Sequence, residues 1–261
     1  MKRTFLFILL LLALSEKLYA FDISGLQPLA PHGVFSTFSA ESLQKNKSSV
    51  EISVERSKGP DFYRLSAKAA YGLNDKLELN LTVPYVYHFA DKKNGLEDIA
   101  VGFKYRFYDE GKYGPSLACL LNASIPSGTD ANGSDGRVGM GFIVSKRVGP
   151  FDGHLNLFYE KSGNASLQDE ISLLGGLEFS AAHNFKILSE IIFKDIPKSP
   201  DKKNQVEARF GYRIKTTDHI YTTFGAGVGL DNRNPEYRIF FSVNVTTPRE
   251  KRNIKKFIEE E

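Results

Sequence analysis

The residues of this chain that could do chemistry are charged side chains at every second position of long alternating stretches. From Asp98 to Phe107 the chain reads Asp-Ile-Ala-Val-Gly-Phe-Lys-Tyr-Arg-Phe. In an extended strand, Lys104 and Arg106 share one face with alanine and glycine, and the other face carries only apolar and aromatic side chains. The charged face favours a water-filled interior, and the apolar face favours contact with lipid.

The same alternation projects charged side chains inward from strands along most of the chain. The candidates for lumen-lining residues are Arg64, Lys68, Glu78, Lys104, Arg106, Glu178, Glu190, Glu207, Arg209, Arg213 and Arg238. We expect opposite signs to meet on neighbouring strands, with Arg209 and Arg213 beside Glu190, and Lys104 and Arg106 beside Glu78. One interpretation is a ladder of ion pairs that keeps a largely filled tube rigid. The other is a transport path whose walls select solutes by sign, and the mixed signs favour the ladder or weak selectivity.

Alternating runs bounded by Gly, Pro, Asn and Asp predict about twelve strands that would position these side chains. Their expected ranges are Ser48–Ser57, Asp61–Gly72, Lys76–His88, Glu97–Tyr108, Gly114–Ile125, Arg137–Val148, Gly153–Lys161, Glu170–Ser180, Phe185–Lys194, Asn204–Ile214, His219–Leu230 and Pro235–Thr246. Strands of soluble proteins are usually about 5 to 6 residues long, whereas a tilted membrane-crossing strand needs about 9 to 11. The lengths therefore favour an all-β, antiparallel, up-and-down transmembrane barrel.

The connections between these strands alternate in length. Tight turns are expected near residues 73–75, 149–152, 182–184 and 215–218, and longer polar loops near 90–96, 126–136, 162–169 and 195–203. Short turns on one rim and long loops on the other are typical of outer-membrane barrels. An even number of strands then places both ends of the barrel on the short-turn, periplasmic side.

The beginning of the chain indicates export. Lys2 and Arg3 precede an apolar run from Phe5 to Leu14, which predicts a signal peptide over residues 1–20, cleaved before Phe21. The expected compartment is the outer membrane of a Gram-negative-type cell. Residues 21–47 are interpreted as a periplasmic arm, a lumen plug or an extra strand, residues 48–246 as the barrel, and residues 247–261 as a charged tail.

Composition argues against several other classes of protein. The formal charge of +3 includes the predicted signal peptide, and without it the charge is about +1, so nothing indicates nucleic-acid binding. Cys119 is the single cysteine, which excludes a disulfide framework. Asp130, Asn132 and Asp135 resemble ordinary loop formers more than a calcium site. We expect no metal and no cofactor.

The histidines do not form a recognisable catalytic motif. His32, His88, His154, His183 and His219 lack a nucleophile elbow or a spaced metal-binding pattern. Because a catalytic triad is recognised by geometry, a lipid hydrolase with a serine and His88 at the outer rim stays an alternative. We expect the protein not to be an enzyme.

Glycines recur in pairs or rows along several strands. Pairs lie at Gly139 and Gly141 and at Gly175 and Gly176, and a third row covers residues 225, 227 and 229. In a barrel, such rows either permit tight curvature or clear space inside the lumen, and both interpretations stay open.

Three segments resemble one known family. They are AYGLNDKLELNLTVPYVY (Ala70–Tyr87), GLEDIAVGFKYRF (Gly95–Phe107) and IPSGTD (Ile125–Asp130), in this order. Together they are similar to the outer-membrane barrels named after the MetA pathway of phenol degradation. The resemblance covers most of the mature chain and implies an outer-membrane pore, with hydrophobic or aromatic small molecules as cargo.

The sequence as a whole predicts a passive outer-membrane channel or transporter. Its expected partners are outer-membrane lipids, a small-molecule solute and the barrel-assembly machinery. The alternatives are a structural or ligand-binding barrel without transport, an outer-membrane lipid hydrolase and, last, a soluble periplasmic β protein.

Overall fold

The computed structural model describes residues 25–58, 61–87, 94–129, 136–163, 169–195, 205–230 and 236–248. These residues form twelve strands of 10 to 13 residues and one strand of two residues, β4 (Gly95–Leu96). The long strands are β1 (Ser48–Lys58), β2 (Phe62–Gly72), β3 (Leu77–Tyr87), β5 (Ile99–Tyr108), β6 (Ser116–Ile125), β7 (Arg137–Val148), β8 (Phe151–Ser162), β9 (Glu170–Ala182), β10 (Phe185–Asp195), β11 (Gln205–Lys215), β12 (Ile220–Gly229) and β13 (Tyr237–Thr246). Every predicted strand boundary lies within two residues of the observed one. Among the described residues, no helix is long and apolar enough to cross a membrane.

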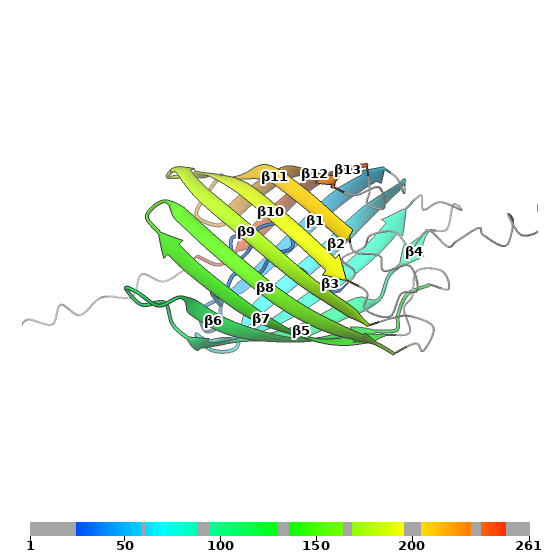
Figure 1. The fold of residues 1–261 in the computed structure, drawn as a ribbon, viewed down its shortest axis with the longest axis horizontal. Coiled ribbons are helices and arrows are strands. Elements are labelled where there is room, and N and C mark those ends of the chain that lie inside the picture. The colour runs from blue at the N-terminus through cyan, green and yellow to red at the C-terminus, as the bar shows by residue number, and fades with distance from the viewer. Residues whose placement is uncertain are drawn as a thin grey trace, which may run out of the picture.

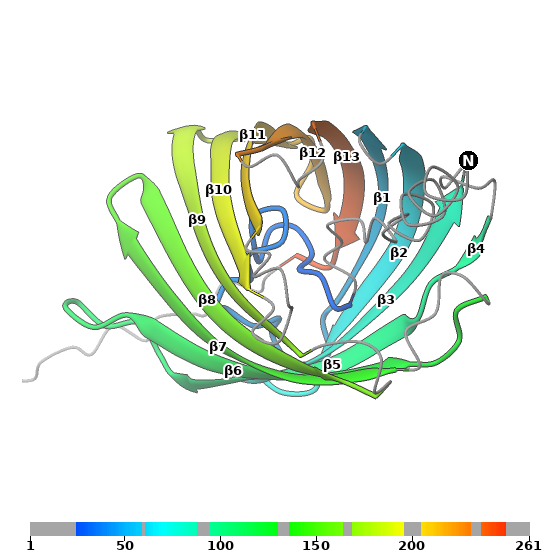
Figure 2. The same ribbon diagram turned by 45° about the vertical axis from the view of Figure 1, so that its right-hand side comes forward.

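The long strands close on themselves. Each pairs antiparallel with its neighbours in chain order, and β13 returns to pair with β1 from Ser49 opposite Thr246 to Lys58 opposite Tyr237. Figures 1 and 2 show the tilted strands curving around a central space. Closure pairs backbone groups that an open sheet edge would expose, which is the condition for crossing a membrane with strands. The predicted antiparallel barrel of about twelve strands is confirmed.

The two faces of the wall have opposite polarity. On β5 the side chains of Phe103 and Tyr105 are 48% and 46% exposed on the outer surface, whereas Lys104 between them is 1% exposed. Large apolar side chains are exposed in this way on the outside of every long strand. Such a continuous apolar surface matches lipid rather than water.

This orientation predicts a large penalty for a charge on the outer face. We expect Phe103→Arg to lower the free energy of unfolding in lipid vesicles by about 2–4 kcal/mol, because an arginine would face hydrocarbon. Tyr113→Arg is the matched control, since Tyr113 is 87% exposed in the connection between β5 and β6. Denaturant titrations in vesicles measure both variants. Equal stabilities for the two variants would contradict the assignment of this face to lipid.

The short turns of one rim are built by local hydrogen bonds. Between β2 and β3, the Asn74 Oδ1 atom accepts hydrogen bonds from the backbone N–H groups of Lys76 and Leu77, each at 2.8 Å. This is an Asx-type turn, for which asparagine is well suited. Between β7 and β8, Gly149 has a φ of 58°, a left-handed conformation that glycine adopts without steric cost.

Residues 25–47 lie inside the barrel. Figure 2 shows this blue segment looping within the ring of strands. Within it, the structure describes a single isolated bridge, between Gly33 and Phe38, and no strand. The segment fills space that a hollow barrel of this size would leave to water.

Candidate functional site in the barrel interior

Ten of the eleven predicted lumen-lining residues are buried inside the barrel, and Arg106 is half-buried near the short-turn rim. The alternation of side chains along each strand determines this placement, because their apolar neighbours face outward. Lys104 on β5 reaches Glu78 on β3 with a distance of 3.2 Å from Nζ to Oε1. These two residues are register partners, so the expected pairing of Lys104 with Glu78 is present.

Six charged side chains, five of them buried and Glu55 partly buried, form a continuous ladder across one side of the interior. Arg64 contacts Glu55 at 3.5 Å, and Glu55 also pairs with Arg238. Arg238 Nε lies 3.5 Å from Glu207 Oε2, and Glu207 Oε1 accepts a hydrogen bond from Arg209 Nε at 2.6 Å. Arg209 completes the ladder with Glu190 at 3.4 Å. Alternating signs allow the buried charges to compensate one another.

Glycine on β12 makes this ladder possible. A Cβ atom at Gly227 would lie 2.7 Å from Glu207 Oε1 and 3.1 Å from Arg209 Cγ. Because no side chain occupies this position, Arg238 on β13 reaches Glu207 on β11 across β12. At this position, the glycine row clears space inside the lumen.

Two pairings differ from the expectation. Arg213 pairs with Glu178 at 3.2 Å rather than with Glu190, because Glu190 stands opposite Arg209 in the β10–β11 register. Arg106 pairs with Asp109 at 3.1 Å rather than with Glu78. Glu78 is matched with Lys104, and Arg106 lies two residues nearer the rim.

Acceptors on the wall bind the backbone of residues 25–47. Glu190 Oε1 accepts hydrogen bonds from the N–H groups of Ser36 and Thr37 at 2.7 and 2.6 Å. Asn156 Oδ1 accepts from the Phe38 N–H at 2.6 Å, and its amide donates to the Phe38 carbonyl at 2.9 Å. Further anchors are Ala30 N–H to Glu51, Ala40 N–H to Ser145 and Leu43 N–H to Glu78, at 2.7 to 2.9 Å. Side chains of the wall thus satisfy buried backbone donors of a segment that forms no strand or helix.

Glycines of the wall provide the space that the segment occupies. Cβ atoms at Gly211 and Gly225 would lie 2.9 and 2.5 Å from the Phe35 ring, and one at Gly176 would lie 2.7 Å from Val34. Phe35 also stacks on Phe240 of β13, with ring centroids 5.6 Å apart. A side chain at these wall positions would require the contacting side chains of the segment to shift or to become smaller.

Residues 25–47 separate the free space of the interior. At the short-turn end lies a cavity of about 490 Å³, lined by charges of both signs, including Arg147, Lys186, Glu41 and Asp152. Smaller cavities of about 50 and 40 Å³ lie between the segment and other parts of the wall. Beside the larger cavity, the hydrogen bond from Lys215 holds the pKa of the Asp218 carboxyl below its ordinary value.

One serine, histidine and carboxylate come together in this cavity. His154 Nδ1 lies 2.8 Å from Ser145 Oγ, and His154 Nε2 lies 3.8 Å from Glu178 Oε1. The second distance is too long for a hydrogen bond. Glu178 is bound instead by Arg213 and Lys186, and Ser145 Oγ accepts the Ala40 N–H. The arrangement lacks the connected nucleophile, base and orienting acid that acyl transfer requires.

Other sequence-predicted features are only partly described. Within the described ranges, no group of three or more His, Cys, Asp or Glu side chains could hold a metal ion. His88 and the loop residues Asp130, Asn132 and Asp135 lie outside those ranges, as do the predicted signal peptide and most of the charged tail.

Sequence reasoning missed the uncharged residues that bind the segment. Asn156 lies between Leu155 and Leu157, so the alternation places it on the inner face. The alternation along β7 places Ser145 on the inner face in the same way. The pattern of a strand does not show which chain segment an inward amide or hydroxyl will bind, and the partner segment has no periodicity.

Comparison with known structures supports the fold. An outer membrane channel from Pseudomonas putida F1 matches with a TM-score of 0.62 at 14% identity, over 80% of this chain and 98% of that one. The NanC porin matches with a TM-score of 0.58 at 10% identity, over 77% of this chain and 100% of that one. The KdgM porin, solved in complex with oligogalacturonate, matches with a TM-score of 0.57 at 11% identity, over 77% and 99%. No curated protein matches the sequence.

The closed wall, apolar outer face and charged interior define the class of outer-membrane β-barrels. Within this class, residues 45–244 match the model of the family described as "Putative MetA-pathway of phenol degradation". The chain belongs to this family, as the three sequence segments predicted.

Proposed function

We propose that this protein is a passive outer-membrane channel whose lumen is closed, in this structure, by residues 25–47. The observation that carries the proposal is a lipid-facing barrel whose buried charges and amides hold a non-barrel segment across the interior. Because water can replace the hydrogen bonds that hold this segment, the segment can leave the lumen without breaking the wall. The channel then opens when the segment moves.

The proposed cargo is a small solute, with hydrophobic or aromatic compounds included. Charges of both signs line the larger cavity, which supports weak selectivity by sign. The proposed location is the outer membrane of a Gram-negative-type cell, after export by a signal peptide over residues 1–20 and insertion by the barrel-assembly machinery. No catalytic role is proposed, because the acid is not hydrogen-bonded to the histidine in the serine–histidine–glutamate cluster.

Solute flux into liposomes tests this function. Purified full-length protein is reconstituted, and the entry of ions, small sugars and small aromatic compounds is compared with entry into protein-free liposomes. We expect measurable flux of small solutes that rises with the amount of folded barrel. Absence of flux for every solute, both for the full chain and for a chain without residues 25–47, would favour a structural barrel without transport.

A further inference from the structure

The inner wall carries an apolar patch among its charged rows. Leu120 on β6, Leu174 on β9 and Ile192 on β10 are each at most 2% exposed, although they face the interior. Phe158 on β8 packs against all three through two adjoining clusters. Apolar side chains that face a hydrated lumen are unfavourable unless an apolar partner covers them.

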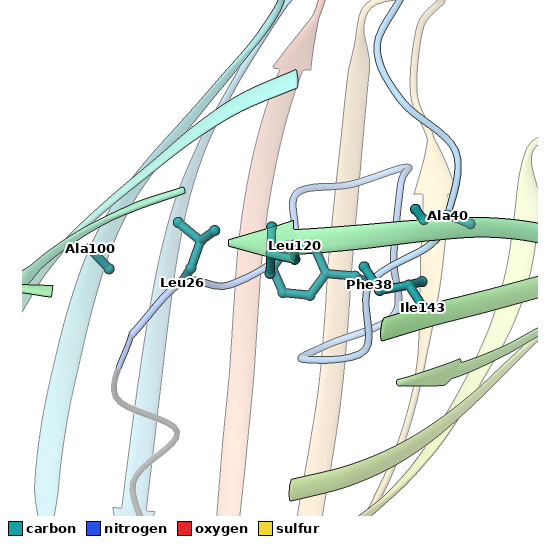
Figure 3. Close-up of a cluster of buried hydrophobic side chains, with 7 residues drawn as sticks. Leu26, Phe38, Ala40, Ala100, Leu120 and Ile143 are labelled. Atoms are coloured by element: carbon teal, nitrogen blue, oxygen red, sulfur yellow. The ribbon is translucent and has the colours of Figure 1, made fainter. Parts of the chain in front are cut away.

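An aromatic ring from the N-terminal segment already covers part of this patch. The Phe38 ring packs edge-to-face on Phe158, with centroids 5.9 Å apart and an interplanar angle of 65°. Figure 3 shows Phe38 between Leu120 and Ile143, with Leu26 and Ala40 of the same segment nearby. The contact demonstrates that a benzene-sized ring fits against this wall.

A cavity adjoins this ring and combines apolar and polar lining. Phe38, Leu120, Phe158, Leu174 and Ile192 form its apolar part. Its polar lining includes Asn122, Glu160, Glu170, Ser172 and Lys194, which lie nearer the long-loop ends of their strands. A solute that enters from the long-loop side would therefore meet polar groups before the apolar patch.

One polar atom of the residues that line this cavity lacks a hydrogen-bond partner. Asn122 is 6% exposed, and its Nδ2 donates a hydrogen bond to Glu160 Oε1 at 2.8 Å. Its Oδ1 atom has no hydrogen-bond partner among the described residues. A buried acceptor without a donor costs stability, which a hydroxyl group on a bound molecule would recover.

We propose that this cavity is a binding site for a small uncharged solute with a benzene-sized apolar ring and one hydroxyl group, and that Phe38 occupies the place of the ring in the closed state. The proposal rests on the proposed channel function, since it names the class of solute that the channel admits. The ring packs on Phe158 and Leu174, and the hydroxyl donates to Asn122 Oδ1.

The size of the cavity requires competition with Phe38. Its volume is about 40 Å³, whereas a dry apolar cavity that binds benzene has about 150 Å³. A solute ring therefore fits only when the Phe38 ring leaves. Because Asn156 holds the backbone of Phe38, displacement of the ring also loosens one anchor of the segment.

Fluorine NMR with two matched probes tests the site. Full-length protein in detergent micelles is titrated with 4-fluorophenol and with fluorobenzene, which differ in the hydroxyl group, against empty micelles as a blank. We expect Phe38→Ala to raise the affinity for both probes about tenfold, because a tethered competitor reduces the apparent affinity to the intrinsic affinity multiplied by the fraction of sites it leaves free. Phe38→Leu provides a second variant without the ring.

Phe35→Ala is the matched control for the removal of a phenylalanine from the segment. Its ring packs on Phe240 and on the glycines of β11 and β12, away from the patch. We expect no comparable gain in affinity from this variant. If neither Phe38 variant changes affinity, or if Phe35→Ala gives the same gain, the patch only docks the segment and the proposal is wrong.

A second pair of variants tests the proposed hydrogen bond from the solute hydroxyl to Asn122. In the Phe38→Ala background, Asn122→Leu is expected to weaken 4-fluorophenol binding about fivefold to tenfold and to leave fluorobenzene binding unchanged. Asn80→Leu makes the same change on β3, outside this cavity, and should affect neither probe. An equal loss for both probes would overturn the hydroxyl contact. If the probes bind but no solute crosses the liposome membrane, the binding site is supported and the channel function is wrong. If solutes cross but the probes do not bind, only the binding site is wrong.

Discussion

Conductance in planar lipid bilayers is expected to rise about fivefold or more when residues 25–47 are deleted, because a barrel of twelve strands is wide enough for a solute path once its lumen is cleared. The segment contributes no strand to the wall, so its removal leaves every pairing of the barrel in place. The acceptors that it covers, such as Glu190 and Asn156, can then bind water.

Two controls separate an open lumen from a damaged barrel. The deletion variant must keep the heat-dependent shift in gel migration of a folded barrel. Phe210→Ala changes an outward-facing side chain that is 64% exposed, and it should leave conductance unchanged. A folded deletion variant with the conductance of the full chain would show that residues 25–47 do not obstruct the path.

The second large effect concerns the stability of the ion-pair ladder. Arg238→Leu is expected to lower the free energy of unfolding by about 3–5 kcal/mol, because the ladder then holds three carboxylates and only two arginines, which leaves one negative charge uncompensated in the interior. Arg238 is 1% exposed and contacts both Glu55 and Glu207. Denaturant titration in detergent or vesicles, followed by circular dichroism, measures the change.

Arg147→Leu is the matched control for this substitution. Arg147 donates three hydrogen bonds to Asp152 at 2.7 to 2.9 Å, but its side chain is 56% exposed at the rim. An exposed pair contributes about 0–1 kcal/mol, so a small change is expected. If Arg238→Leu and Arg147→Leu lower the free energy of unfolding by similar amounts, the interior is as well hydrated as the rim.

Several interior charges contact both the wall and residues 25–47. Glu190 pairs with Arg209 in the ladder and also accepts the N–H groups of Ser36 and Thr37. Arg213 pairs with Glu178 and donates to the carbonyl groups of Gly33 and Val34. The same charges therefore brace the wall and hold the segment.

The wall could be predicted from the sequence because its signals are local. The alternation around Lys104 assigns inside and outside, and Asn74 and Gly149 mark turns by their own chemistry. Register then follows from the turns and the buried face. These features require no knowledge of distant residues.

The contents of the lumen could not be predicted in the same way. Phe38 and Asn156 are 118 residues apart in sequence, and neither type of residue specifies the other. Arg106 pairs with Asp109 rather than with Glu78, because the β5–β6 register shifts between Arg106 and Tyr108 and the alternation of side chains does not predict such a shift. The sequence does not identify Asn122 as a candidate binding residue. An inward amide indicates a binding site only when the structure shows that its carbonyl oxygen has no hydrogen-bond donor.

A reversible tether between the segment and the wall tests whether solutes pass only when residues 25–47 leave their place. A Cβ atom at Gly176 would lie 3.1 Å from Thr37 Cβ, shorter than the separation of about 3.8 Å in a disulfide, and 2.7 Å from Val34 Cγ2. Val34→Ala is therefore added to the parent protein, so that the segment can shift slightly and the bond can form. Thr37→Cys and Gly176→Cys are combined with Cys119→Ser, and thiol labelling verifies the bond.

Solute flux is then measured in the same liposomes before and after reduction. We expect negligible flux while the disulfide is intact, and recovery to the level of the parent with Cys119→Ser and Val34→Ala when it is reduced. Equal flux in the two states, with the disulfide verified, would contradict the claim that residues 25–47 control the path through the barrel.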